Sequence, residues 1–459
     1  MSKKTRIALL IGALLATLWA LMPASLKTST DKRRAGPPVQ EVVSPSGLKA
    51  WLVEDQSLPI VTFEMAWQGG SVTDPENQRG VTYVLSTMLN EGAGPLDSLA
   101  FQKAMADKAI TLNFDSSRDH LTGTLRCLSK FKQTCFELLK LALTAPRFDD
   151  DALARMKADH HARVRSRQQN PSSIAYDQFF ASAFAGHPYA HPSRGAIDSV
   201  KALSREDLAA HFKRHIARDN LYLAVVGDID GQELAPLMDE IFAALPAQNS
   251  LPEIAPAVPQ PGPYSAHTQR GGPQTTVVFG FQGIDYHDPL YFPARVLTTV
   301  LGDGGLASIL TEEVRNKRGL AYSVNTQLMN LTHANMWIGS VASDNKTAQQ
   351  AMDVIQAEMD KVISAPDAFR ETHADSIADV KTYLAGSYAL NFDSGKKIAG
   401  QLLGVQLIGF PITYFETRNE RVHRVTMPQA LRAADKLFHQ TLRISSVGGT
   451  KIALPRQNP

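Results

Sequence analysis

The stretch that decides the fold reads Gly80-Val-Thr-Tyr-Val-Leu-Ser-Thr-Met-Leu-Asn-Glu-Gly-Ala93, an apolar run that predicts a buried helix. An alternating apolar run at residues 60–67 precedes it and predicts a strand. Gly69-Gly70 and the turn at Asp74-Pro75 separate the strand from the helix. Strand, glycine turn and apolar helix therefore form one unit, which can be searched for elsewhere in the chain.

The same unit recurs 214 residues later. Trp67-Gln68-Gly69 aligns with Phe281-Gln282-Gly283, and Asp74-Pro75 aligns with Asp288-Pro289. Other expected strands and helices also correspond, namely residues 120–127 with 335–341, 130–143 with 347–362, and 221–226 with 442–447. A repeat of this length predicts an α+β protein made of two homologous domains.

A proline-rich segment at residues 246–263 has no periodic apolar pattern and predicts the linker between these domains. We therefore expect an N-terminal domain at residues 41–245 and a C-terminal domain at residues 264–459.

The first forty residues differ from the rest. Residues 7–24 carry no charge and lie between basic clusters, close to the lower limit of about 17 residues for a membrane-spanning helix. Residues 27–40 are polar, basic and proline-containing, as a tether would be. We expect a signal-anchor and tether at residues 1–40, and an exported body in the periplasm, held at the inner membrane. The alternative is a signal peptide that is cleaved after export.

The composition is that of an ordinary globular protein, and the formal net charge of +2 gives no reason to expect a nucleic-acid partner. Cys127 and Cys135 are the two cysteines, too few for a cysteine-based metal site. In an oxidising compartment they could form a disulfide, and the alternative is a small buried side chain and a half-exposed thiol.

The order of strand, glycine pair and helix resembles the pitrilysin/insulinase family of zinc peptidases, over residues 42–447. That resemblance implies two α/β sandwich domains joined by a linker. The family's zinc helix carries H-x-x-E-H, in which two His bind zinc and the Glu acts as general base. On this pattern the three positions fall on Tyr83, Ser86 and Thr87. The third ligand, a Glu on the expected helix at residues 153–167, falls near Arg163. The resemblance thus implies a family member that binds no zinc.

A second pattern lies in the C-terminal domain, where Leu301-Gly-Asp-Gly-Gly305 leads to Arg315 and then to Gly319-Leu-Ala-Tyr322. In the family the corresponding Arg and Tyr reach the substrate carbonyl, so the resemblance implies substrate-binding roles for Arg315 and Tyr322. In the alternative interpretation, Arg315 caps its own helix and Tyr322 packs on the core.

The resemblance implies the non-catalytic subunit of a heterodimer whose partner, a homologous chain, carries H-x-x-E-H and the zinc. This chain would then need no cofactor of its own and would hold a peptide for the partner. The alternative is a scaffold or chaperone-like peptide binder without any peptidase role. A third hypothesis is a rearranged metal site that uses His160 or His161, or the pair His211 and His215.

Overall fold

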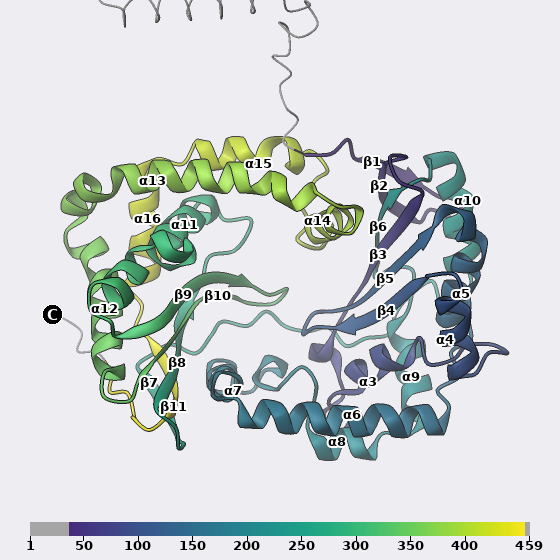
Figure 1. Ribbon diagram of the computed structural model, residues 1–459, viewed down its shortest axis with the longest axis horizontal. Helices are drawn as coiled ribbons and strands as arrows, with labels where there is room; N and C mark the ends of the chain where they lie inside the picture. Colours follow the sequence, from purple (N-terminus) through teal and green to yellow (C-terminus); the bar gives the residue numbers. More distant parts are fainter. Residues whose placement is uncertain (1–35, 455–459) are drawn as a thin grey trace, which may run out of the picture.

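The computed structural model describes residues 36–454, which form two β-sheets with helices packed on them (Figure 1). The first sheet has the strand order β1-β2-β6-β3-β5-β4 and the second has the order β7-β11-β8-β10-β9. The first half of the chain forms β1 (Gln40–Val43), β2 (Lys49–Glu54), β3 (Ile60–Gln68), β4 (Thr111–Ser116), β5 (His120–Leu128) and β6 (Leu221–Gly227). Its helices are α3 (Val81–Met88), α4 (Ser98–Ala106), α5 (Lys132–Thr144), α6 (Asp150–Gln169), α7 (Pro171–Ala183), α8 (Ile197–Ala202), α9 (Arg205–His215) and α10 (Gly231–Phe242).

The second half repeats this arrangement. Its strands are β7 (Tyr264–Gln269), β8 (Gln274–Gln282), β9 (Ala321–Asn330), β10 (Asn335–Asp344) and β11 (Arg443–Gly448). Its helices are α11 (Tyr291–Thr298), α12 (Ala348–Ser364), α13 (Pro366–Tyr388), α14 (Gly395–Leu407), α15 (Tyr414–His423) and α16 (Met427–Phe438).

Strand order confirms the sequence repeat. Without β1, the order β2-β6-β3-β5-β4 matches β7-β11-β8-β10-β9 strand for strand. The β2–β6 and β7–β11 pairs are both parallel, whereas the other pairs in the two matched sets are antiparallel. β3 and β8 are also separated by 214 residues, the interval of the sequence repeat. The fold is therefore two homologous domains of mixed helix and strand content, as predicted.

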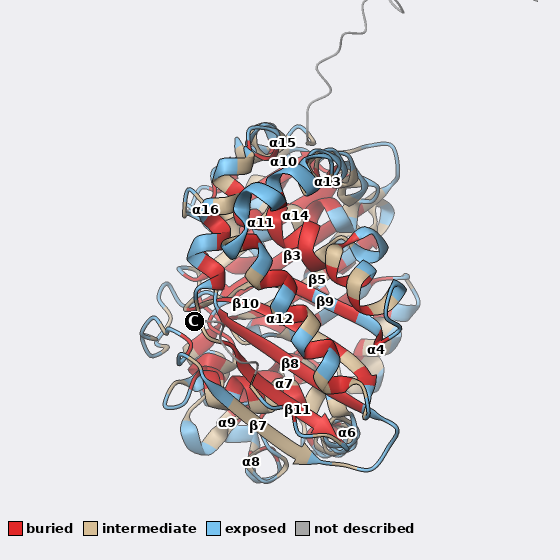
Figure 2. Ribbon diagram, turned by 90° about the vertical axis from the view of Figure 1, so that its left-hand side faces the viewer, coloured by how far each residue is buried: buried red, intermediate tan, exposed pale blue. Residues whose placement is uncertain are grey.

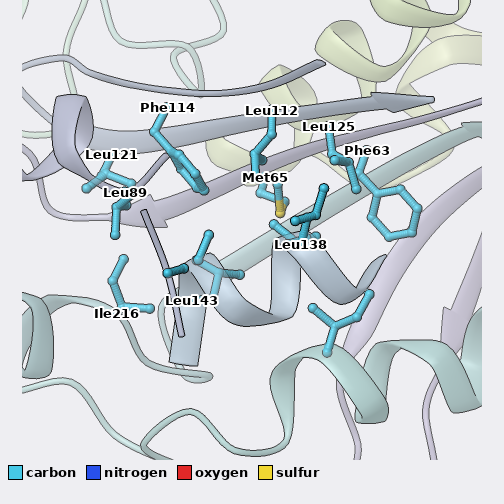
Figure 3. Close-up of a cluster of buried hydrophobic side chains, with 14 of the residues drawn as sticks. Phe63, Met65, Leu89, Leu112, Phe114, Leu121, Leu125, Leu138, Leu143 and Ile216 are labelled. Atoms are coloured by element: carbon cyan, nitrogen blue, oxygen red, sulfur yellow. The ribbon is translucent and has the colours of Figure 1, made fainter. Parts of the chain in front are cut away.

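Each sheet places alternate side chains on opposite faces. On β3, Phe63 and Met65 point into the core beneath α3 and α5, where Leu138 and Leu143 meet them (Figure 3). Ala66, on the other face of the same strand, packs in a separate cluster with Leu402 of α14. In the second domain β8, β10 and β11 are largely buried, whereas the edge strand β7 is only partly covered (Figure 2).

Each half of the chain contributes one helix that packs on the sheet of the other half. α7, from the first half of the chain, packs on β8 and β11 of the second sheet, and α14, from the second half, packs on β3 and β6 of the first (Figure 1). Phe179 of α7 lies in a buried cluster with Val278 and Met336. Each sheet is thus enclosed by helices from both halves of the chain.

The proline-rich segment 246–263 contains no helix or strand. Its backbone forms hydrogen bonds with both halves of the chain. Gln260 N donates to Ala183 O (2.7 Å), and Ala257 N donates to His333 O (2.7 Å). Its role as a linker and the domain boundaries drawn from it stay predictions.

The expected signal-anchor at residues 7–24 lies outside the described residues. Between residues 36 and 454, no helix is both long and apolar enough to span a membrane. Cys127 and Cys135 are buried free thiols in the structure, on β5 and α5.

Candidate functional site

The helix that corresponds to the zinc helix, α3, begins at Gly80, which has a φ of +94°. A side chain could not replace its hydrogen, because a Cβ atom there would lie 2.6 Å from the carbonyl oxygen of Arg194. Asp74 caps the helix: its carboxylate accepts the Gly80 N–H (2.7 Å) and the hydroxyl of Thr82 (2.5 Å). Burial raises the pKa of Asp74 to about 7.

Tyr83 occupies the first ligand position as a packed aromatic side chain that is 6% exposed. Its ring lies 5.5 Å from the ring of His160 on α6, and the guanidinium of Arg194 lies 5.4 Å from the Tyr83 ring centroid. His160 Nε2 donates to the carbonyl oxygen of Arg194 (2.8 Å). Burial raises the pKa of Tyr83 and lowers the pKa of His160, which favours a neutral phenol beside a neutral imidazole.

Ser86 and Thr87 are turned back onto their own helix. Ser86 Oγ donates to the carbonyl oxygen of Tyr83 (2.7 Å), and Thr87 Oγ1 donates to that of Val84 (2.8 Å). Arg163 forms an ion pair with Asp159 (2.5 Å), and its side chain is 55% exposed. The structure therefore brings Tyr83 together with His160, and Arg163 lies outside that contact.

These side chains do not suit zinc. The H-x-x-E-H motif binds zinc through two imidazoles and supplies a carboxylate as general base. In their place α3 carries the Tyr83 phenol, which packs on the imidazole of His160, and two hydroxyls, which bond to helix carbonyls. Across residues 36–454, no cluster of three or more His, Cys, Asp or Glu side chains could hold a metal ion.

His211 and His215, the other pair considered for a metal, are fully buried on α9. His211 Nε2 lies 2.8 Å from Thr82 Oγ1 and 3.3 Å from His215 Nδ1, so the two imidazoles belong to the network that anchors the start of α3. Burial lowers the pKa of His211, and it lowers that of His215 to about 4. Two neutral, buried imidazoles in this setting support helix packing.

Arg315 and Tyr322 lie together in the second domain. The guanidinium carbon of Arg315 is 5.1 Å from the centroid of the Tyr322 ring, and Tyr322 is 77% exposed although it lies in β9. The alternative in which Tyr322 packs on the core is therefore wrong.

The other alternative assigned Arg315 to its own helix end, and Arg315 does lie in the last turn of the helical segment Thr311–Asn316. The side-chain hydrogen bond to that segment comes from Arg318, whose guanidinium donates to the carbonyl oxygen of Glu313 (2.9 Å). Both Lys317 and Arg318 form ion pairs with the Glu313 carboxylate. Within the described chain, the Arg315 side chain has no ion pair and no hydrogen bond, and its contact is the Tyr322 ring. Arg315 thus presents free N–H donors next to an exposed phenol.

The backbone before Arg315 is irregular. Two π-helical turns, Thr299–Asp303 and Thr311–Asn316, flank the glycine-rich loop, and π-helical turns often occur at functional sites. At Gly302 a Cβ atom would lie 2.4 Å from Thr326 Oγ1, so glycine is required for the loop to pass close to β9.

Two features could not be assigned from the sequence. The sequence marks His160 only as a possible relocated ligand, although its spacing of three residues from Arg163 places it near the same helical face. Asp119 belongs to no sequence motif: its carboxylate accepts the Tyr189 hydroxyl and the backbone N–H of Thr332 (3.0 Å), which joins the two domains. No local pattern marks such a contact, because its members are far apart in the sequence.

Comparison with known proteins agrees with this geometry. The family model "Insulinase (Peptidase family M16)" matches residues 50–196, and the model "Peptidase M16 inactive domain" matches residues 202–372. The Helicobacter pylori protein "Non-peptidase homolog YmxG" is 24% identical over 386 residues, which are 82% of this chain and 86% of that protein. Subunit 1 of the rat mitochondrial cytochrome b-c1 complex is 25% identical over 289 residues, 61% of this chain and 59% of that subunit.

A solved structure is similar over nearly the whole chain. It is a peptidase M16 inactive domain from Pseudomonas fluorescens, with a TM-score of 0.82 and 26% identity, and the match covers 92% of this chain and 100% of that one.

Proposed function

The chain belongs to the insulinase family of peptidases, family M16, as a non-catalytic member, and we propose from this premise that it is the substrate-binding subunit of a two-chain zinc peptidase. In this proposal Arg315 and Tyr322 hold the backbone of a peptide, and a homologous partner chain supplies H-x-x-E-H and zinc.

The observation that carries the proposal is the free Arg315 guanidinium beside an exposed Tyr322. Lys317 and Arg318, its basic neighbours, both form ion pairs with Glu313, so among these three cations Arg315 is the one without an ion pair. An unpaired arginine on an exposed aromatic ring contributes little to stability, which favours a role in binding.

The chemistry of the pair suits a peptide carbonyl. The guanidinium presents several N–H donors in a rigid fork with a fixed positive charge, and the phenol adds an O–H donor. Donors fixed in advance stabilise the oxyanion that develops when a carbonyl is attacked. This chain would provide that stabilisation, and nucleophile and metal would have to come from elsewhere, because α3 carries no side chains that suit zinc.

Assembly with a homologous partner is supported by analogy. The cytochrome b-c1 relative is, by its name, one subunit of a larger complex. We further propose that the assembly is periplasmic and held at the inner membrane by residues 7–24, on the strength of their uncharged sequence between basic clusters.

Purification of the native complex, followed by metal analysis of each separated subunit, tests the proposal. We expect a homologous chain with intact H-x-x-E-H to co-purify and to hold the zinc, while this chain holds none. A native complex with no zinc-binding subunit would favour the scaffold alternative.

A further inference from the structure

A cavity of about 420 Å³ opens on the second domain between the segment after β8, the turn after α14, and α15. Its walls include Tyr286, Phe292, Phe410 and Val425, and its charged side chains are Asp288, Arg421 and Arg424. The volume is within the range of about 300 to 1,000 Å³ that is typical of small-molecule sites. It is separate in sequence from Arg315 and Tyr322, neither of which lines it.

The first domain has a counterpart of this cavity with a different set of side chains. Asp74-Pro75 aligns with Asp288-Pro289 in the repeat, and the Gly186-His187-Pro188 turn resembles the Gly409-Phe410-Pro411 turn. In the first domain these segments line a cavity of about 340 Å³ with Asp74, Glu76, His187 and His191. Its one arginine, Arg79, faces Glu76 (3.5 Å). The duplicated fold thus provides a similar hollow twice. The second copy keeps one carboxylate and one imidazole, Asp288 and His287, and adds aromatic rings and a second arginine.

Arg421 is the unpaired charge of the second cavity. Its guanidinium lies 5.7 Å from the Phe410 ring centroid and 5.9 Å from that of Tyr414, and in the described part of the chain it has no ion pair or hydrogen bond. Arg424 is bound to Glu420 (2.5 Å). The Asp288 carboxylate is bound to Lys436 (2.5 Å), so it does not neutralise Arg421.

The aromatic wall behind Arg421 is held in place. Phe410 stacks on Tyr414, with ring centroids 4.8 Å apart and an interplanar angle of 9°. The ring of His287 meets Phe410 edge-on at 4.9 Å, and His287 Nε2 donates to the carbonyl oxygen of Ile408 (2.9 Å). A site with fixed walls loses little conformational entropy when a ligand binds.

We propose that this cavity binds a carboxylate attached to an aromatic or branched apolar group, and that the C-terminal residue of a peptide is its ligand. The planar fork of Arg421 matches a carboxylate bidentately, and Phe292, Phe410 and Val425 receive the apolar group. A multiply charged anion such as phosphate fits less well, because the cavity offers one unpaired guanidinium and also contains the Asp288 carboxylate. The proposal goes beyond the substrate-binding role of Arg315 and Tyr322 and does not depend on it.

Calorimetric titration of the full chain with N-acetyl-Ala-Phe as the free acid and as the amide tests this site. We expect the acid to bind at least about tenfold more tightly than the amide, since one lost charge-assisted hydrogen bond costs roughly 1.5 to 3 kcal/mol. Arg421→Gln should abolish the difference, and Arg421→Lys should keep part of it. The control Arg370→Gln removes another half-exposed helix arginine, paired with Asp367 on α13, and should change nothing.

Equal binding of acid and amide would overturn the proposal, as would binding that survives Arg421→Gln or no binding at millimolar concentration. A further titration with 3-phenylpropionate, which has the carboxylate and ring without a peptide bond, identifies the source of the ligand. Binding as tight as that of the dipeptide would assign the cavity to small aromatic acids, and binding about tenfold weaker would assign it to peptide C-termini.

Discussion

The ring of Tyr83 packs 5.5 Å from the ring of His160, at the place where an active family member would hold zinc between α3 and α6. The two side chains come from the helix of the first two ligands and the helix of the third. The site has therefore become a packing contact between helices, and its remaining polar groups, Ser86 and Thr87, bond within α3.

Restoring the zinc helix alone should not restore a peptidase. In the triple variant Tyr83→His, Ser86→Glu, Thr87→His, α6 would still offer Arg163 where a Glu is needed. We expect less than one zinc per chain by atomic emission and no cleavage of a fluorogenic peptide by the isolated chain. Stoichiometric zinc that is lost on adding His160→Ala would contradict this expectation and would identify His160 as a replacement ligand.

The Tyr189 hydroxyl should stabilise the contact between the two domains. It bonds to the buried Asp119 carboxylate and accepts the backbone N–H of His333 (3.1 Å). Tyr189→Phe removes the hydroxyl that bonds to the Asp119 carboxylate and to the backbone N–H of His333. The free energy of unfolding in urea should therefore fall by about 1 to 3 kcal/mol. Tyr383→Phe, at an exposed tyrosine of α13, is the matched control and should change it by about 0.5 kcal/mol or less. Equal effects of the two substitutions would show that the contact contributes nothing.

His215 should make the fold sensitive to acid. Burial lowers its pKa to about 4, whereas an exposed imidazole has a pKa of about 6.5. The neutral side chain therefore stabilises the fold above pH 6.5, and this contribution is lost as the pH falls toward 4. The unfolding free energy of the wild type minus that of His215→Gln should fall by up to about 1.4 kcal/mol per pH unit in this window. A difference that does not vary with pH would place the His215 pKa near its ordinary value.

Export depends on residues that the structure does not describe. Alkaline phosphatase needs an oxidising compartment, so a fusion after Gln40 should be active and should sediment with membranes if residues 7–24 form an uncleaved anchor. An inactive fusion would contradict export, and an active but soluble one would contradict the anchor alone.

The sequence was sufficient to predict individual strands and helices, because these depend on local patterns of apolar and polar residues. The alternation at residues 60–67 predicted β3, and the repeat predicted β8 in the same register. The exchange of α7 and α14 could not be predicted in this way. An apolar helix face shows that a helix is buried, but it does not show which of two similar sheets covers it.

Some residues of the candidate sites could be located from local sequence patterns, and others could not. Tyr83, Ser86 and Thr87 could be located because they follow a strand and a glycine turn at fixed spacing. Arg163 could not be placed reliably, because a shift of three residues along α6 brings His160 to the contact with Tyr83. Only the folded loop shows that Tyr322 is exposed, and that Glu313 pairs with Lys317 and Arg318 while Arg315 has no ion pair.

The most direct test of the account is the peptidase activity of the complex reconstituted with its zinc-binding partner, measured with Arg315→Ala and Tyr322→Phe in this chain. Loss of one such donor lowers the rate by about 100 to 1,000-fold, and we expect that loss while assembly and Tm stay near those of the wild type. Arg370→Ala and Tyr383→Phe, at an exposed arginine and tyrosine of α13, are the matched controls and should keep full activity. Full activity in both Arg315→Ala and Tyr322→Phe would contradict the account and leave the scaffold alternative in its place.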